Sequence, residues 1–170
     1  MIKRLPLAVA VCLLAASPAA ADYETGVLAY DQGRFDEANK AFRALAESGH
    51  AGAEFMLGAI YFYGKGVPRD DALAAIWFHK AAIKGNPHAQ LAFGSLHVRG
   101  IGVRQDLVEA YKWLTVAADS DQPTLGQQAL LLRGEAAALM RPDEIEEAQR
   151  RATEWEPIRA GLTGFRETRQ

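Results

Sequence analysis

Residues 53–85 read AEFMLGAIYFYGKGVPRDDALAAIWFHKAAIKG, and residues 89–121 repeat the pattern as AQLAFGSLHVRGIGVRQDLVEAYKWLTVAADSD, at an offset of 36 residues (89 − 53). Glycines, an aspartate, a tryptophan and small residues recur at the same positions of the two copies: Gly58 and Gly94, Gly64 and Gly100, Gly66 and Gly102, Asp70 and Asp106, Trp77 and Trp113, and Ala81-Ala82 and Ala117-Ala118. A fixed offset of this size is typical of stacked supersecondary units. The sequence therefore predicts a repeat protein whose units pack side by side.

Each copy contains a glycine-rich loop between two expected helices. In the first copy this loop is Gly64-Lys65-Gly66-Val67, and its two glycines allow backbone angles that other residues resist. The valine can turn inward, and Asp70 can cap the second helix by accepting a hydrogen bond from a free backbone N–H group. The second copy has the same features, so both units are expected to be helix pairs joined by the same kind of loop.

A shorter unit precedes the two copies. Residues 22–32 and 35–48 are expected to form its two helices, with a tight turn at Gly33. After this turn the offset to the next unit is again 36, whereas before the turn it is 32, from Gly26 to Gly58. The first unit therefore lacks four loop residues that the later units possess (36 − 32).

The two copies resemble the Sel1-like repeat family, a relative of the tetratricopeptide repeats, and the first unit has tetratricopeptide-like spacing. The matching pattern is Ala53, Leu57-Gly58, Tyr61, Gly64-x-Gly66-Val67, Asp70, Ala74, Trp77, Ala81-Ala82 and Gly85. A few positions depart from the pattern. The position of Tyr61 is occupied by His97 in the second copy and by Ala29 in the first unit, and the position of Gly85 is occupied by Asp121 in the second copy. The resemblance implies an all-α fold, namely a right-handed α-solenoid of antiparallel helix pairs with a C-terminal capping helix pair.

The resemblance also divides the chain into units at about residues 22–50, 51–86 and 87–121, with a cap at 122–156. The first cap helix is expected to pack through apolar residues that include Leu125, Ala129, Leu130, Leu132, Ala136, Leu139 and Met140. The second cap helix has an expected buried stripe of Ile145, Ala148, Ala152 and Trp155. Residues 157–170 are expected to be a flexible tail.

Two features of the repeat are expected to hold the units together. Gly58 and Gly94 lie in the middle of helices, where glycine costs about 1 kcal/mol relative to alanine. That cost is understandable if another helix crosses there and leaves no space for a side chain. Trp77 and Trp113 are expected to fill the space between units.

The first 21 residues have the features of a secretory signal peptide. Lys3 and Arg4 precede an apolar run, residues 5–16, which is too short for a transmembrane helix and is followed by small residues. Cleavage is expected after Ala21, and a short membrane anchor is the alternative. The protein is therefore expected to be of the exported bacterial type, periplasmic or secreted, with no stable membrane insertion after cleavage.

The charge of the chain bears on its possible partners, and its cysteine content bears on how the fold is stabilised. The formal net charge is −2, and it becomes −4 (17 − 21) without Lys3 and Arg4. Because there is no basic stripe, nucleic acid is not an expected partner. The single cysteine, Cys12, lies in the expected signal peptide, so packing would hold the exported chain without disulfide bonds.

The sequence contains no recognisable catalytic, metal-binding or cofactor-binding motif. Gly64-Lys65-Gly66 lacks the spacing, and the serine or threonine, of a phosphate-binding loop. The histidines are not at metal-ligand spacing, and His97 is expected to be partly buried. Some cysteine-rich Sel1-like proteins bind or hydrolyse β-lactams, but this chain lacks their paired cysteines. We therefore expect no enzyme activity, metal or cofactor; a cell-wall or β-lactam-related ligand binder or enzyme is the alternative.

The first helices of stacked helix pairs line a concave surface that can bind a partner. Matching them to the tetratricopeptide frame leaves these residues free of packing: Tyr23, Val27, Tyr30 and Asp31; Phe55, Ala59, Phe62 and Tyr63; and Leu91, Ser95, Val98 and Arg99. Aromatic side chains often anchor interfaces, although some of these could instead be buried between helices. We therefore expect a protein or peptide partner and a role as an envelope adaptor or regulator. A purely structural spacer is a further alternative, and the oligomeric state stays open.

Overall fold

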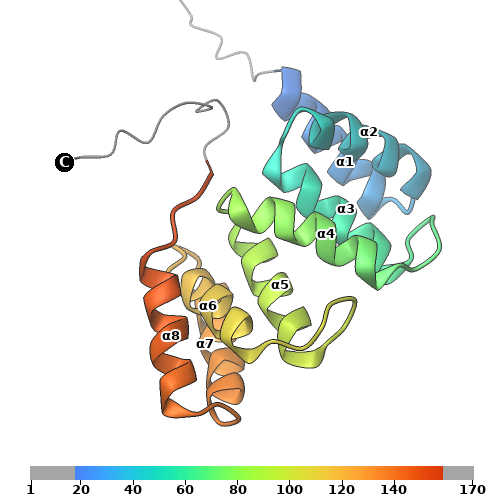
Figure 1. The fold of residues 1–170 in the computed structure, drawn as a ribbon. Helices are drawn as coiled ribbons and strands as arrows, with labels where there is room; N and C mark the ends of the chain where they lie inside the picture. The colour runs from blue at the N-terminus through green and yellow to red at the C-terminus, as the bar shows by residue number, and fades with distance from the viewer. Residues whose placement is uncertain (1–17, 159–170) are drawn as a thin grey trace, which may run out of the picture.

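The computed structural model describes residues 18–158, and every regular element within that range is an α-helix (Figure 1). The helices are α1 (Pro18–Asp31), α2 (Phe35–Glu47), α3 (Ala51–Tyr63), α4 (Asp71–Ile83), α5 (Pro87–Arg99), α6 (Leu107–Ala118), α7 (Pro123–Ala137) and α8 (Pro142–Thr153). The expected all-α fold is therefore confirmed. Helix α1 starts ahead of the expected cleavage position, and residues 1–17 of the expected signal peptide and 159–170 of the expected tail lie outside the described residues.

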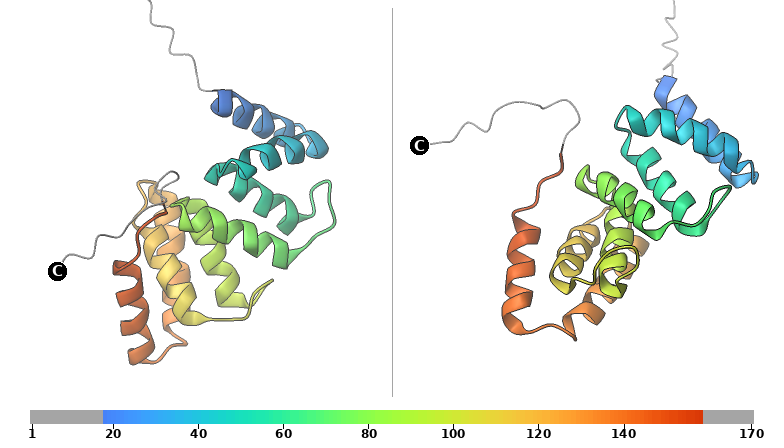
Figure 2. Two further views of the ribbon diagram at one scale, coloured as in Figure 1. Left: turned by 45° about the horizontal axis from the view of Figure 1, so that its top comes forward. Right: turned by 45° about the vertical axis from the view of Figure 1, so that its right-hand side comes forward.

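The helices form a stack in which each of the first six packs on the next one along the chain (Figures 1 and 2). The pairs α1–α2, α3–α4 and α5–α6 are the repeated units. The terminal pair is arranged differently, because α7 and α8 both pack on α6 and make little contact with each other. The stack therefore ends in two helices that share one supporting helix.

The expected aspartate caps are present. Asp70 Oδ1 accepts a hydrogen bond from the Leu73 N–H at 2.9 Å, and Asp106 Oδ1 accepts the equivalent bond in α6, also at 2.9 Å. These bonds satisfy N–H groups that have no partner within the first turn of a helix. Helix α3 is capped by His50, whose Nδ1 accepts from the Ala53 N–H at 3.1 Å. The histidine cap was not expected from the sequence.

The second glycine of each loop lies against the preceding unit. A Cβ atom at Gly102 would lie 2.0 Å from the Asp71 carbonyl oxygen at the start of α4. One at Gly66 would lie 2.6 Å from the Phe35 Cβ at the start of α2, a residue offset from Asp71 by the same 36 positions. Both glycines also have left-handed φ angles, +67° and +71° respectively. The loops are therefore contacts between units as well as tight turns.

The mid-helix glycines face the second helix of their own unit. A Cβ atom would lie 2.5 Å from the Phe78 ring at Gly58, and 2.8 Å from Leu114 Cγ at Gly94. The expected crossing of another helix is confirmed. At Gly58, however, an aromatic ring of that helix, rather than its backbone, occupies the space. Phe78 and Leu114 are buried, so a larger side chain at either glycine would displace core residues.

The hydrophobic core is continuous from unit to unit. One cluster of buried side chains lies on α1 to α3 and a second on α3 to α6, and Val67 and Trp77 pack against both. Trp113 belongs to the second cluster and is only 1% exposed, as the repeat predicted. Trp77 is half-buried, so the two equivalent tryptophans have different environments.

The apolar side of α7 differs in part from the expectation. Leu125, Ala129 and Ala136 are buried, but Leu130 is 47% exposed and Leu139, just beyond the helix, is 69% exposed. The prediction for these two leucines was wrong. The reason is that α8 packs on α6 instead of covering α7, so only part of the α7 surface is shielded.

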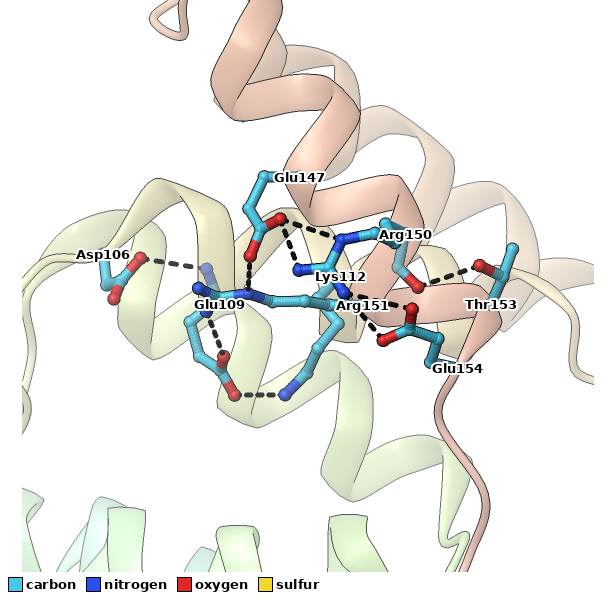
Figure 3. Close-up of polar contacts among 8 residues, drawn as sticks. All are labelled: Asp106, Glu109, Lys112, Glu147, Arg150, Arg151, Thr153 and Glu154. Atoms are coloured by element: carbon cyan, nitrogen blue, oxygen red, sulfur yellow. Dashed lines mark hydrogen bonds and ion pairs between the residues drawn. The ribbon is translucent and has the colours of Figure 1, made fainter. Parts of the chain in front are cut away.

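The expected buried stripe of α8 is buried only in part. Ala148 is fully buried, whereas Ile145, Ala152 and Trp155 are half-buried. Polar contacts add to this packing (Figure 3). Arg151 Nε lies 2.7 Å from Glu147 of its own helix, and Arg151 Nη1 lies 4.0 Å from Glu109 of α6. These ion pairs are partly exposed and contribute little individually, so apolar contact with α6 holds α8 in place.

Residues 155–158, the C-terminal strap, run from α8 toward the second unit. The Trp155 ring lies edge-on to the Trp113 ring, with 5.7 Å between their centroids. At the end of the strap the Ile158 N–H donates to the Ile83 carbonyl oxygen at 2.7 Å. Of the two described residues of the expected tail, Ile158 is therefore bonded to the last residue of α4, and Pro157 lies beside Gly85 just beyond it.

His97 is expected to make the stability of the protein depend on pH. It is partly buried, as expected, and its Nδ1 has no hydrogen-bond partner among residues 18–158. Burial lowers the pKa of the imidazole, although the Glu109 and Asp106 carboxylates oppose this shift. The unfolded chain binds a proton near the usual pKa of about 6.5, whereas the folded chain resists protonation. The free energy of unfolding is therefore expected to be highest above about pH 6.5 and to fall as the pH decreases below it.

Urea denaturation at about pH 7.5 and about pH 5.5 measures this effect, and the midpoint should be lower at the acidic pH. His97→Gln cannot titrate and should make the difference between the two midpoints smaller. Part of the difference should persist, because burial also lowers the pKa of His79. An equal difference in the variant and the wild type would contradict the assignment to His97.

Candidate functional site

A groove lies between α3 and α5, the first helices of the second and third units, and we call it the α3–α5 groove. Its volume is about 370 Å³. The lining residues come from four helices and are Phe55, Ala59, Phe62 and Tyr63 of α3, Phe78 of α4, His88, Leu91, Ala92, Ser95, Leu96 and Arg99 of α5, and Leu132 of α7. Most of the residues expected at a partner-binding surface on α3 and α5 are thus brought together.

Helix α3 forms one wall because its groove residues follow one side of the helix. Ala59 comes four positions after Phe55, and the adjacent pair Phe62-Tyr63 comes three and four positions after Ala59. Ring contacts with the floor fix the aromatic side chains of this wall. The Phe55 centroid lies 5.7 Å from that of Phe78, and the Phe62 centroid lies 6.4 Å from it. Phe78 can serve as the floor because its ring lies over Gly58, which has no side chain to exclude it.

Helix α5 forms the opposite wall through Leu91, Ser95 and Arg99, which are spaced four residues apart and lie on one face. His88 stands at the start of this wall, with its ring centroid 5.6 Å from that of Phe55. His88 contacts an α3 ring, so it links the two walls at one end of the groove.

The groove side chains range from exposed to buried. Tyr63 is 63% exposed, and Phe55 and Phe62 are half-buried, so their rings are partly accessible to a partner. Ala59 lines the groove but is only 8% exposed, which makes it part of the floor rather than an anchor. The groove therefore offers aromatic surface that the fold holds in place.

The expected residues of α1 do not line the α3–α5 groove. Tyr23 stacks on His50 at 4.9 Å between centroids, and Tyr30 lies edge-on to Phe35 at 5.4 Å. Val27 is half-buried against the first core cluster. These side chains pack within the first unit, and Tyr23 also lies beside Gly52 at the start of α3.

Asp31 and Val98 are also absent from the groove lining. Asp31 is exposed at the end of α1, and Val98 is half-buried. Burial raises the pKa of the Tyr30 hydroxyl, and the charge of Tyr63 acts in the same direction. Tyr30, Asp31 and Val98 are therefore not part of the groove wall.

Five groove residues were missed by the sequence reasoning: Phe78, His88, Ala92, Leu96 and Leu132. Ala92 and Leu96 lie on a first helix, at positions that the repeat frame did not select. Phe78 belongs to a second helix, and Leu132 to the cap, so neither occurs on the first helices that the repeat frame selected. His88 occurs on a first helix, but it precedes the matched part of the repeat. No pattern in the sequence marks these residues as neighbours of the others.

A second hollow, of about 560 Å³, lies beside the C-terminal strap, and its lining includes Trp155, Pro157 and the acidic residues Asp119 and Asp121. It is a gap between the strap and the helix ends rather than an aromatic surface. Among residues 18–158, no group of three histidine, cysteine or acidic side chains is placed to hold a metal ion. Within the same range no helix has the length and apolar character needed to cross a bilayer.

The chain matches the Sel1 repeat family at residues 51–86 and 87–122, the units that supply both walls of the groove. It is similar to an exopolysaccharide production negative regulator of Rhizobium meliloti (strain 1021), with 40% identity over 63 residues. The similarity covers 37% of this chain and 24% of the regulator, so the chain spans about a quarter of that protein's length.

Two solved structures share the fold. A protective antigen of uropathogenic Escherichia coli with an SLR fold superposes with a TM-score of 0.75 and 27% identity, over 82% of this chain and 30% of the antigen. A Sel1 repeat protein from Oxalobacter formigenes superposes with a TM-score of 0.59 and 31% identity, over 66% of this chain and 88% of that protein. The α-solenoid expected from the repeat is thereby confirmed.

Proposed function

Since the chain belongs to the Sel1 repeat family, we propose that it is an exported adaptor or regulator that binds a protein or peptide partner in the α3–α5 groove. Sel1 repeats generally mediate protein–protein interaction and typically act as non-catalytic scaffolds. The observation that carries the proposal is the groove itself, where partly exposed aromatic rings line a hollow between two repeats.

The geometry of the groove suits an interaction site. Aromatic side chains in a concave, largely apolar surface are the usual anchors of a protein interface. Here Phe55 and Phe62 already contact the buried Phe78, so little side-chain entropy remains to be lost when a partner binds. Tyr63 adds a ring with a hydroxyl group at the exposed margin.

A place in the cell envelope is supported by the signal-peptide features of residues 1–21. A regulatory role is supported by the similarity to the Rhizobium meliloti protein, whose name describes negative regulation of exopolysaccharide production. That similarity covers part of the regulator only, so we extend to this chain the class of function and not a particular pathway.

The groove variant Phe62→Asp plus Tyr63→Asp tests the proposal. Two carboxylates in the aromatic wall would lose hydration when an apolar side chain binds, which would cost several kcal/mol of binding free energy. Affinity purification from an envelope extract is expected to recover a partner with the wild-type chain and to lose it with the variant. Partner recovery can be measured by mass spectrometry after crosslinking in living cells.

A matched control is Ile76→Asp plus Leu131→Asp, which places the same two charges on exposed apolar residues outside the groove. This control should keep the partner, and circular dichroism should show that both variants remain helical. If the groove variant recovers the partner as well as the control does, the groove is not the binding site. Turnover of muropeptides or β-lactams by the purified protein would instead support an enzyme.

A further inference from the structure

We propose that the α3–α5 groove selects peptides in which an acidic side chain lies next to a large apolar or aromatic one, with Arg99 as the receptor for the carboxylate. The inference rests on the proposed function, because it assumes that the groove binds a peptide segment. It adds the chemistry of that segment, which follows from charge and shape in the groove.

Arg99 is available to a partner. It is the last residue of α5, it is exposed, and it has no ion pair with any residue in the described part of the chain. Several other exposed arginines are paired within the chain, as Arg69 is with Asp71 at 2.7 Å and Arg150 with Glu147 at 2.6 Å. Arg99 is thus a guanidinium group at a groove margin that no carboxylate of the structured part neutralises.

Two backbone carbonyl groups at the C-terminal end of α5 already accept hydrogen bonds, so they do not need the Arg99 guanidinium as a donor. The Leu96 carbonyl oxygen accepts the Ile101 N–H at 3.1 Å, and the Val98 carbonyl oxygen accepts Gln105 Nε2 at 2.8 Å. These bonds satisfy carbonyl groups that would otherwise need a cation or water. The side chain of Arg99 is therefore free to bind an external acceptor.

Among residues 18–158, no carboxylate lines the groove. Its ionisable side chains are Arg99, His88 and Tyr63, and none of them is negatively charged at neutral pH. The whole chain has a formal net charge of −2, so the groove is locally more positive than the molecule that carries it. An acidic segment would gain attraction at this site and would be repelled elsewhere on the surface.

The apolar part of the groove sets the second requirement. Phe55, Phe62, Leu91 and Leu132 surround a hollow of about 370 Å³, which has room for more than one side chain. Ser95 lies one turn before Arg99 on the same face of α5 and supplies a hydroxyl donor between the apolar part and the cation. A peptide would therefore place its ring or aliphatic side chain in the hollow and its carboxylate beside Arg99.

Charge also weighs against the chain's own C-terminal residues as the occupant. Residues 159–170 contain Arg159, Arg166 and Arg169 against Glu167 alone. A segment with this excess of positive charge is not complementary to a groove whose margin already has an unpaired arginine. The acidic–apolar peptide of another protein fits the charges better.

Selection from a phage-displayed library of random peptides tests the inference. The wild-type protein is expected to enrich sequences with Asp or Glu beside Leu, Phe, Tyr or Trp. The Arg99→Glu variant should reverse the charge preference and enrich Lys or Arg at that place. For one enriched acidic peptide, Arg99→Gln should weaken the affinity roughly tenfold, as expected for a charge-assisted hydrogen bond at a partly exposed site.

Arg104→Glu is the matched control, because Arg104 is also exposed and unpaired among the described residues but does not line the groove. It should keep the acidic preference. If the enriched peptides need Phe62 and Tyr63 but show no acidic preference, the Arg99 inference is wrong and the proposed groove function stands. If Phe62→Asp plus Tyr63→Asp leaves peptide binding intact, or if no groove-dependent peptide is enriched, both are overturned.

Discussion

Replacing Trp113 with alanine is expected to lower the free energy of unfolding by about 3–5 kcal/mol, the usual range for truncating a buried tryptophan. The ring is 1% exposed and lies against Phe93 and Trp155, at 5.9 and 5.7 Å between centroids. Its Nε1 also donates to Glu109 Oε1 at 2.6 Å. The alanine variant would leave a cavity where α5, α6 and the C-terminal strap meet.

Urea denaturation followed by circular dichroism measures this loss as a shift of the midpoint. Trp77→Ala is the matched control, because Trp77 occupies the equivalent repeat position but is half-buried. Its cost should be clearly smaller than that of Trp113→Ala. If both substitutions lower the free energy of unfolding by a similar amount, the position in the repeat, rather than burial in the tertiary structure, determines how much the ring contributes to stability. A Trp113→Ala variant with the wild-type midpoint would show that this ring is not part of the core.

Gly102→Ala is the second change expected to have a large effect, with a loss of roughly 2–5 kcal/mol. One part of this loss is the left-handed backbone angle, φ +67°, which costs about 1–2 kcal/mol for a residue with a Cβ atom. The other part is steric, because the new Cβ would lie 2.0 Å from the Asp71 carbonyl oxygen. The third unit would have to move away from the second.

Gly33→Ala separates the two parts. Gly33 has a similar φ of +74°, but a Cβ atom there would meet nothing within 4 Å. This control should therefore show the backbone cost alone. Thermal unfolding of the two variants compares them directly. Equal destabilisation would mean that the contact between the loop and α4 has no energetic weight.

Much of the architecture could be read from the sequence, because the contacts that build a repeat protein recur in each unit. The capping aspartates, the glycine-rich loops and the buried Trp113 all stand at positions that the offset of 36 identifies. Errors occurred where the repeat ends. Leu130 and Leu139 were expected to pack, but the final helix covers α6 instead, and no repeated position encodes that choice.

The candidate site could be predicted in part. The frame selected the four groove residues of α3 and half of those of α5, because the two helices come from equivalent full-length units; it also selected Val98, which does not line the groove. It did not reveal that the α1 residues lie outside this groove and that Tyr23 and Tyr30 pack on His50 and Phe35. It also could not find Phe78, since that ring reaches the groove only through the space above Gly58.

The sequence by itself determined the helix pairs, their order and the loops that join them, since these depend on local signals and on contacts repeated in each unit. Only the tertiary structure decided the groove, because its floor, its end and its charge come from helices of different units. Phe78, His88 and Leu132 meet there through the angles at which α3, α4, α5 and α7 pack. Those angles result from the sum of many side-chain contacts, which no single spacing in the sequence records.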